Sequence, residues 1–327
     1  MSRRAAALFL LALAACQPYQ GPPQKGGEPP DGGNRIEPDF VDQTWAELMQ
    51  HTQIGVPGRA THPCASRDGK FIVYSSTETG PRSQIFIRAT GGVAPTQVTT
   101  NNGQNLFPRF SPDGKRIAFA SDVAGNFDIY VVLKDAPANW MQVTTSAQDD
   151  VAPSWSPDGK KIAYSTKNPN GVWQLIIVDV GTGMPTFLGP GMYPDWSPTG
   201  EWIAFQSQPK GDWRSSIWLV RPDWTDLQEV AADRHKQWAA ITPRFSPDGK
   251  WIAYATVNRS VESRIYGEAG AADNIWVIMP DGRGDTQITT DLSAEWWPSW
   301  GGERVFFVSD RHRHPNIYSV KPKPLIE

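Results

Sequence analysis

The chain has 327 residues, 39% hydrophobic and 20% charged, with a net charge of −3. This length and hydrophobic content suffice for a large packed core and exclude a wholly disordered chain. No basic stripe follows the sequence, which argues against a nucleic-acid partner. Its two cysteines, Cys16 and Cys64, are too few for a disulfide framework or a zinc cage.

The N-terminus has the order of an export signal. Arg3 and Arg4 precede an apolar run over residues 5–15, which is typical of a secretory signal peptide and too short to span a bilayer. The run ends in Leu-Ala-Ala-Cys at Cys16, which resembles the lipobox of bacterial lipoproteins. We therefore expect a signal peptide over residues 1–15 and lipid on Cys16, and an ordinary cleaved signal with an incidental cysteine is the alternative.

A tether and a short lead-in are expected next. Residues 16–38 are rich in Pro and Gly with hardly an apolar side chain, the composition of a solvated linker. Residues 39–51 carry apolar side chains at near-helical spacing, which predicts a short helix or lead-in. Gln17 follows Cys16 where, by resemblance to Gram-negative sorting signals, an Asp would favour the inner membrane. We therefore expect an exported, lipid-anchored protein on the periplasm-facing outer membrane.

One phrase recurs along the rest of the chain at intervals of about 41–53 residues. In the third copy it reads PSWSPDGKKIAYST from Pro153, a short strand, a turn and a strand that alternates polar and apolar residues. Each copy adds a second apolar strand, and most add a polar edge strand. The copies begin at Pro63, Pro108, Pro153, Pro194, Pro243 and Pro298.

This period predicts an all-β fold, a six-bladed β-propeller of four-stranded blades over residues 52–322, with a tail at 323–327. The sixth copy lacks its outer strand, whereas Thr-Gln-Ile at residues 52–54 matches the edge-strand phrase. We therefore expect a strand near residues 52–54 to complete the sixth blade and close the ring.

The turns explain the recurring acids and glycines, since Asp bonds nearby amides and Gly accepts positive φ. The turn residues are Asp68, Gly69, Asp113, Gly114, Asp158, Gly159, Gly200, Asp248 and Gly249.

The Ser-Pro-Asp-Gly phrase, the Ser-Asp…Ile-Tyr pieces at 121–130 and 309–318, and the Gln-Ile-Thr-Thr ending resemble the WD40-like (PD40) repeats of the TolB-like propellers. The resemblance covers roughly residues 52–320. It implies partners of the Tol-Pal type in the bacterial envelope. TolB itself has an α/β domain ahead of its propeller, for which we see no room here, so the resemblance implies a TolB-like lipoprotein and not TolB.

Few catalytic motifs are present in the sequence. No Gly-x-Ser-x-Gly elbow occurs. His312 and His314 are two residues apart, so in a strand they would share a face and could bind one metal ion. They fall in a loop of the repeat, however, and we interpret them as solvated residues. Cys64 is read as a buried or half-buried free thiol. We expect no metal, no cofactor and no enzymatic activity. The alternative is a carbohydrate-active propeller enzyme, a lyase or hydrolase, with a metal in the central channel.

A binding surface is expected where the loops enter the innermost strands, because propellers usually bind at one end of the channel. These loops mix acids, amides and aromatics, which would suit a protein segment or a glycan. The predicted function is a monomeric, membrane-anchored module that binds or scaffolds envelope proteins, with a purely structural surface protein as a further reading. The candidate residues are Asn105, Phe107, Asp149, Asp150, Tyr193, Trp238, Trp296 and Trp297.

Overall fold

The computed structural model describes residues 45–55, 58–92, 94–207, 215–231, 238–258, 273–290, 293–312 and 314–322. The predicted signal peptide (1–15), Cys16, the tether (16–38) and the tail (323–327) lie outside these ranges. None of the described residues belongs to a helix with the length and apolar character that crossing a bilayer requires.

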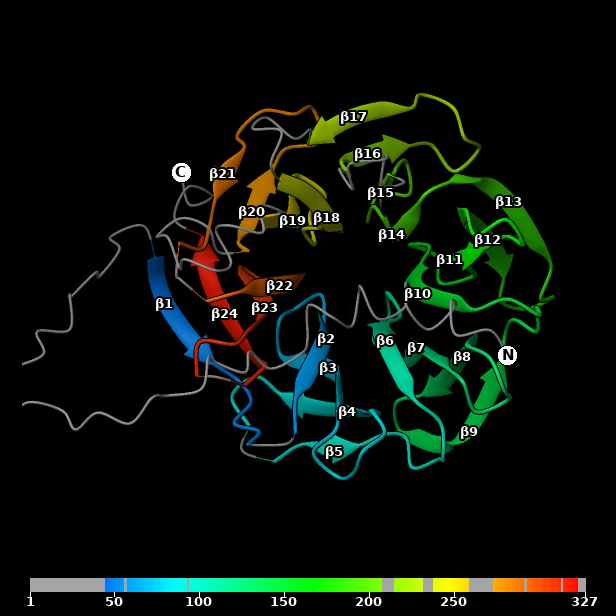
Figure 1. Cartoon of the computed structure of the whole chain (residues 1–327), viewed down its shortest axis with the longest axis horizontal. Coiled ribbons are helices and arrows are strands. Elements are labelled where there is room, and N and C mark those ends of the chain that lie inside the picture. Colours follow the sequence, from blue (N-terminus) through cyan, green and yellow to red (C-terminus); the bar gives the residue numbers. More distant parts are fainter. Residues whose placement is uncertain are drawn as a thin grey trace, which may run out of the picture.

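The described residues form six antiparallel sheets of four strands each, set around a central axis as in Figure 1. The predicted six-bladed propeller is therefore confirmed. From inside to outside, blade 1 has β2 (Ala60–Ala65), β3 (Phe71–Ser76), β4 (Gln84–Ala89) and β5 (Thr96–Gln97), and blade 2 has β6 (Asn105–Phe110), β7 (Arg116–Ser121), β8 (Asp128–Leu133) and β9 (Ala136–Gln142). Blade 3 has β10 (Asp150–Trp155), β11 (Lys161–Lys167), β12 (Trp173–Asp179) and β13 (Pro185–Pro190), and blade 4 has β14 (Met192–Trp196), β15 (Ile203–Gln206), β16 (Ile217–Val220) and β17 (Gln228–Ala231). Blade 5 has β18 (Trp238–Phe245), β19 (Ile252–Asn258), β20 (Ile275–Ile278) and β21 (Thr286–Gln287), and blade 6 has β22 (Glu295–Gly301), β23 (Arg304–Ser309), β24 (Asn316–Pro322) and β1 (Trp45–Gln50).

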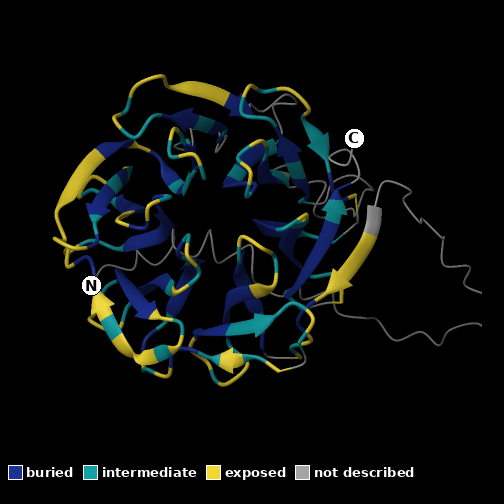
Figure 2. Ribbon diagram, turned by 180° about the vertical axis from the view of Figure 1, so that it is seen from behind, coloured by how far each residue is buried: buried dark blue, intermediate teal, exposed yellow. Residues whose placement is uncertain are grey.

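Burial falls from the inner strands of each blade to its outer strand (Figure 2). The second strand of every blade holds a branched aliphatic residue near its start that is completely buried, and each contributes about 1.5–3 kcal/mol of hydrophobic stabilisation. Because the same position is buried in all six blades, the core is a set of equivalent contacts between neighbouring sheets. These residues are Ile72, Ile117, Ile162, Ile203, Ile252 and Val305.

The turn between the first two strands is a local hydrogen-bond motif. In blade 3, the Ser156 hydroxyl donates to Asp158 Oδ1 at 2.6 Å and the Lys160 amide donates to the same oxygen at 3.0 Å. Gly159 has a φ of +67°. The same bonds recur at Asp68, Asp113 and Asp248, and Thr199 takes the place of the acid beside Gly200. Gly69, Gly114, Gly200 and Gly249 also have positive φ.

The N-terminal strand closes the ring, but at a different place from the one predicted. β1 pairs antiparallel with β24, with Gln50 opposite Tyr318 and Trp45 opposite Pro322. Residues 52–54 are not the strand. They follow it, and Thr52 Oγ1 and the Ile54 amide both donate to Asn316 Oδ1, at 2.8 and 2.9 Å.

The helix considered for residues 39–51 is likewise wrong for the described part, residues 45–50, which is extended. Residues 39–44 lie outside the described residues. The physical reason is that the outer edge of β24 offers unpaired backbone groups, which only an extended segment can satisfy. This tertiary demand overrides the near-helical spacing of the apolar side chains.

Candidate functional site

Every innermost strand carries a bulge at a residue that precedes a proline. In each strand the register with its neighbour shifts at this point. The residue before the proline has a left-handed backbone, which is uncommon and costly for any residue but Gly. A bulge redirects side chains, and here it turns them towards the axis. The residues are His62, Phe107, Ala152, Tyr193, Thr242 and Trp297, with φ between 51° and 56°.

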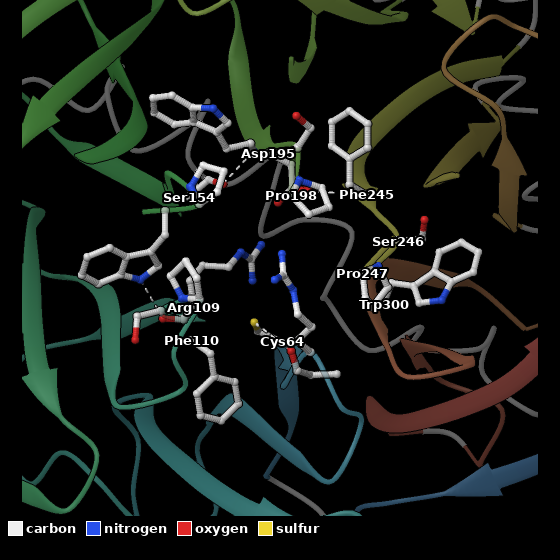
Figure 3. A pocket seen from close by; sticks show the side chains of 18 residues that line it. Cys64, Arg109, Phe110, Ser154, Asp195, Pro198, Phe245, Ser246, Pro247 and Trp300 are labelled. Atoms are coloured by element: carbon white, nitrogen blue, oxygen red, sulfur yellow. Dashed lines mark hydrogen bonds between the residues drawn. The ribbon is translucent and has the colours of Figure 1, made fainter. Parts of the chain in front are cut away.

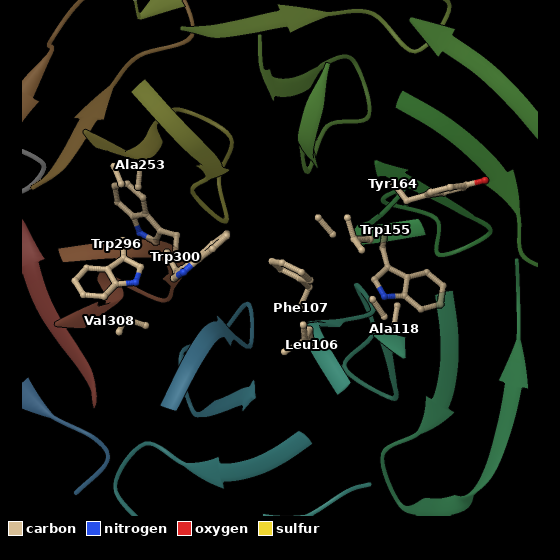
Figure 4. Packing of buried hydrophobic residues seen from close by; sticks show 14 of the residues in the cluster. Leu106, Phe107, Ala118, Trp155, Tyr164, Ala253, Trp296, Trp300 and Val308 are labelled. Atoms are coloured by element: carbon tan, nitrogen blue, oxygen red, sulfur yellow. The ribbon is translucent and has the colours of Figure 1, made fainter. Parts of the chain in front are cut away.

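Four of these side chains form an aromatic plug, which we define as His62, Phe107, Tyr193 and Trp297. The His62 ring centroid lies 4.1 Å from that of Phe107 and 4.5 Å from that of Trp297, and Tyr193 lies 5.4 Å from Trp297. Phe107 reaches in between the inner strands in Figure 4. His62 and Tyr193 come from opposite blades, so their shared contacts close the channel across its width.

Burial within the plug controls the protonation of His62. Desolvation, helped by the positive charges of Arg109 and Arg59, lowers the pKa of His62 to about 3. The Thr61 hydroxyl lies 3.0 Å from its Nδ1. His62 is therefore neutral at physiological pH and acts as an aromatic packing residue.

The residues directly after the prolines form a second layer, which we call the polar ring. Three of its side chains accept a hydrogen bond from a backbone amide of the next blade. Ser154 accepts from Trp196 at 2.9 Å, Asp195 from Phe245 at 2.8 Å and Ser299 from Ala65 at 2.9 Å. These bonds tie neighbouring blades together next to the axis. The polar ring consists of Cys64, Arg109, Ser154, Asp195, Arg244 and Ser299.

A pocket of about 150 Å³, which we call the turn-side pocket, opens at the polar ring. Cys64, Arg109, Ser154 and Asp195 enter it from four separate blades (Figure 3). Each inner strand runs from its entering loop to its turn, so the polar ring lies nearer the turns and the aromatic plug nearer the entering loops. The pocket therefore opens on the turn side and is closed underneath by the plug. Its rim consists of Phe110, Trp155, Trp196, Phe245, Trp300, Pro112, Pro157, Pro198 and Pro247.

Burial controls the acid and the thiol in this pocket. Desolvation raises the pKa of Asp195 to about 7, against the hydrogen bond from Phe245 and the positive charge of Arg109. Arg244 Nη1 lies 3.8 Å from Asp195 Oδ1. Desolvation likewise raises the pKa of the Cys64 thiol, although Arg109 opposes the shift. Cys64 is a buried free thiol.

Three of the predicted binding residues, Phe107, Tyr193 and Trp297, meet in the aromatic plug. Trp296, which precedes Trp297 in the sequence, is buried in the core near Ala253 and Val308 (Figure 4). From the sequence, these four aromatic residues are expected on the loops that enter the innermost strands. The bulge instead directs three of them to the axis and one between blades.

The other predicted residues hold loops in place. Asn105 Nδ2 donates to Gln84 Oε1 at 3.1 Å and to the Gly103 carbonyl at 3.2 Å. Asp149 accepts from the Phe127 amide at 3.0 Å, and the buried Asp150 accepts from the Ser146 hydroxyl at 3.1 Å. Trp238 packs edge-on against Trp276, with ring centroids 6.0 Å apart.

Sequence reasoning missed Arg109, Asp195 and Arg244. A usable signal was present, because the position after each repeat proline is polar or small although the strand around it is buried. Polar residues at one fixed position of an inner strand indicate side chains that face the axis.

A metal site gains no support from the described residues, since none of them form a group of three or more His, Cys, Asp or Glu able to hold an ion. His312 Nδ1 instead lies 2.7 Å from the Tyr318 hydroxyl. His314 is also among the described residues and joins no such group.

Comparisons with known proteins agree with the repeat. The family model "TolB beta propeller domain" (PD40) matches residues 59–212. The Tol-Pal system protein TolB of Anaeromyxobacter dehalogenans is 30% identical over 134 residues, which is 40% of this chain and 27% of that protein. The chain thus matches only about a quarter of the length of this curated relative.

Solved structures share the fold. A putative TolB from Agrobacterium tumefaciens superposes with a TM-score of 0.61 at 21% identity, covering 81% of this chain and 90% of that one. An oligogalacturonate lyase in complex with manganese gives 0.59 at 15% identity, covering 88% and 96%. Such low identities show the fold alone. With its PD40 repeats and its six four-stranded blades, the chain is a TolB-like six-bladed β-propeller.

Proposed function

We propose that the protein is a membrane-anchored, extracytoplasmic module that binds or scaffolds other proteins in the bacterial envelope. The lipid on Cys16 would hold it at the periplasmic face of the outer membrane, and residues 16–38 would serve as the tether. Its similarity to TolB, a Tol-Pal system protein, supports an envelope partner of that type. A glycan is the other ligand class that the loops would suit.

The observation that carries this proposal is the turn-side pocket. It is built from inner strands that the polar ring ties together, so its side chains are held in a fixed geometry. The aromatic plug closes it underneath, and a ligand can enter the pocket without passing through the ring. A recess with convergent polar groups and an apolar rim is typical of a recognition site.

The entering-loop face is the second candidate contact surface. Asp149, Tyr193 and Trp238 keep part of their surface accessible there. Partly exposed aromatic side chains are frequent anchors in protein interfaces. We propose that these three residues, and not the buried Asn105 and Asp150, are available to a partner on that side.

Crosslinking in intact cells, followed by identification of the captured proteins, tests the proposal. Arg109→Gln should reduce capture if the turn-side pocket is used, and Asp149→Asn combined with Trp238→Ala should reduce it if the opposite face is used. The control is Arg283→Gln, which removes the same charge from a side chain that is 80% exposed and lies between β20 and β21 in blade 5. Capture that none of these variants alters would contradict a role for either face.

The alternative is a carbohydrate-active enzyme with a metal in the channel, which the shared fold with the manganese-bound lyase favours. Metal analysis of the purified protein separates the two proposals. Stoichiometric manganese or zinc that disappears with loss of activity on a polysaccharide would support the enzyme.

A further inference from the structure

Arg109 is buried in the turn-side pocket without a carboxylate in salt-bridge contact, although its charge acts on Asp195 at longer range. It is 6% exposed, and its Nη1 donates to the carbonyl of its own neighbour, Pro108, at 3.0 Å. Its Nε has no hydrogen-bond partner, and among the described residues the pocket carboxylate, Asp195, has its salt bridge with Arg244 and not with Arg109. A buried charge that is neither paired nor fully hydrogen-bonded is expensive, so such a group calls for an explanation.

The polar ring explains why this side chain is available. At Ser154, Asp195 and Ser299 the ring residue accepts an amide hydrogen from the next blade. Arginine has donors only and cannot take this role. The backbone carbonyl of Arg109 accepts from Trp155 Nε1 of the next blade at 3.2 Å, but its side chain makes no such tie, and its guanidinium donors point to another use.

The charges around the pocket are unbalanced. Its charged lining residues, within the described part of the chain, are Arg67, Arg109 and Asp195. Arg244, from the blade opposite Arg109, lies against Asp195, and its Nε is also without a partner. Two arginines thus line the pocket and a third lies against its single carboxylate, so positive charge is in excess there even when Asp195 is ionised.

The shape of the pocket narrows the choice of anion. At about 150 Å³ it has room for a side chain or a chain end and not for a folded domain. The tryptophan, phenylalanine and proline rim is suited to the apolar part of a polypeptide. Asp195 places a carboxylate beside the guanidinium groups, which disfavours a dianion such as phosphate more than a monoanion.

We propose that the turn-side pocket binds a carboxylate of a partner polypeptide, from an acidic side chain, with the Arg109 guanidinium as its main contact. This inference rests on the proposed function for the identity of the partner, since it names the group by which a protein partner is recognised. A guanidinium offers parallel N–H groups that match the two oxygens of a carboxylate. The exposed Arg67, which also lines the pocket, adds long-range attraction.

Calorimetric titration of the full-length lipidated protein in detergent, at low ionic strength, tests the site without a cellular partner. The probes are an N-acetylated, C-amidated tetraglutamate peptide, the matching tetraglutamine peptide and inorganic phosphate. Tetraglutamate should bind saturably and tetraglutamine should not. Arg109→Gln should weaken tetraglutamate binding about 10- to 100-fold, and Arg109→Lys should weaken it less, because it keeps the charge and loses the fork.

The control Arg283→Gln should leave tetraglutamate affinity unchanged. A thermal melt of each variant without peptide checks folding, and Arg109→Gln should melt no lower than the parent because it removes an unpaired buried charge. Equal tetraglutamate binding by parent and Arg109→Gln, or none by the parent, would overturn the proposal. Phosphate bound more tightly than tetraglutamate would assign the pocket to a phosphoryl ligand and overturn the carboxylate assignment.

The same variants keep this inference separate from the proposed function. If tetraglutamate binding depends on Arg109 but crosslinking in cells captures no envelope protein, the carboxylate site stands and the envelope role fails. If capture occurs and is insensitive to Arg109→Gln, the module binds its partner elsewhere and the carboxylate site is not the contact.

Discussion

The turns and the polar ring lie only two residues apart along each inner strand, yet they differ in how the six blades use them. The turn beginning at Ser156 has the same hydrogen bonds as those beginning at Ser66, Ser111 and Ser246. The polar ring has Cys, Arg, Ser, Asp, Arg and Ser at six equivalent places. Positions that build the blade repeat, whereas positions that face the axis are free to differ.

This difference shows where function can reside in a propeller. A turn must satisfy its own backbone, so its sequence is fixed by local geometry. Ser154, Asp195 and Ser299 tie neighbouring blades, but an axial side chain that makes no such tie, such as that of Arg109, can be selected for what it binds. Substitutions at the two kinds of position should therefore behave differently, and four measurements test that expectation.

The largest effect is expected at the aromatic plug. Phe107→Ala removes the ring that contacts His62, Tyr193 and Trp297, and it should cost about 3–5 kcal/mol of unfolding free energy. Ala152 occupies the equivalent place in blade 3, so alanine itself is compatible with this backbone. Urea denaturation measures the loss. The control Phe187→Ala, on a side chain that is 58% exposed, should change stability by less than about 0.5 kcal/mol.

The next effect is expected at the ring closure, where the repeat is broken. Asn316 accepts hydrogen bonds from Thr52 and from the Ile54 amide, so Asn316→Ala leaves both donors without their partner. We expect a loss of about 2 kcal/mol, and faster hydrogen exchange of the β1 amides than of those in β11. Asn170→Ala, at an exposed turn, is the control. Uniform acceleration in both strands would show that closure at Asn316 is not local.

The repeated features could be predicted from the sequence, and the axial ones could not. The blade number, the strand pairs and the roles of Asp158 and Gly159 depend on neighbours in the chain, which local rules describe. The direction of Phe107 and Arg109 depends on a left-handed residue before a proline, a conformation that local propensity disfavours and that the surrounding blades impose. Sequence reasoning therefore placed the binding residues on entering loops and overlooked the turn-side pocket.

The predicted position of the ring-closing strand was wrong for a related reason. Residues 52–54 match the edge-strand phrase, and residues 45–50 do not. The free edge of β24 nevertheless pairs with the latter, because backbone pairing depends on the register of the edge and not on the side-chain phrase. Asn316 then uses its side chain to hold the segment that carries the phrase.

A pH-dependent effect is expected at Asp195. Burial raises its pKa to about 7 in the folded state, above the unfolded value near 3.9, so the folded protein binds the extra proton between these values. Stability from this group therefore falls as pH rises from about 4 to 7, although Arg109, Arg244 and the Phe245 amide partly offset the charge. Asp195→Asn should gain about 1–2 kcal/mol relative to the parent between pH 5 and pH 8.

Urea denaturation of both proteins at each pH measures that gain. His62 titrates in both and cancels in the difference. The control is Asp135→Asn, on a side chain that is 88% exposed, and it should change stability by less than about 0.5 kcal/mol. A pH-independent difference for Asp195→Asn would mean that Arg109 and Arg244 keep the carboxylate ionised in the folded state.

The smallest effect is expected at the turns, where the loss of unfolding free energy should be nearly the same in different blades. Asp158→Ala removes the acceptor for Ser156 and the Lys160 amide at an exposed site, and it should cost about 1 kcal/mol. Asp113→Ala and Asp248→Ala should agree with it within about 0.5 kcal/mol, because each breaks the same pair of bonds. Alanine at Ser154, Asp195 and Arg244 should give three different costs. If the turns scatter as widely as the axis, the distinction between blade-building and axial positions does not hold.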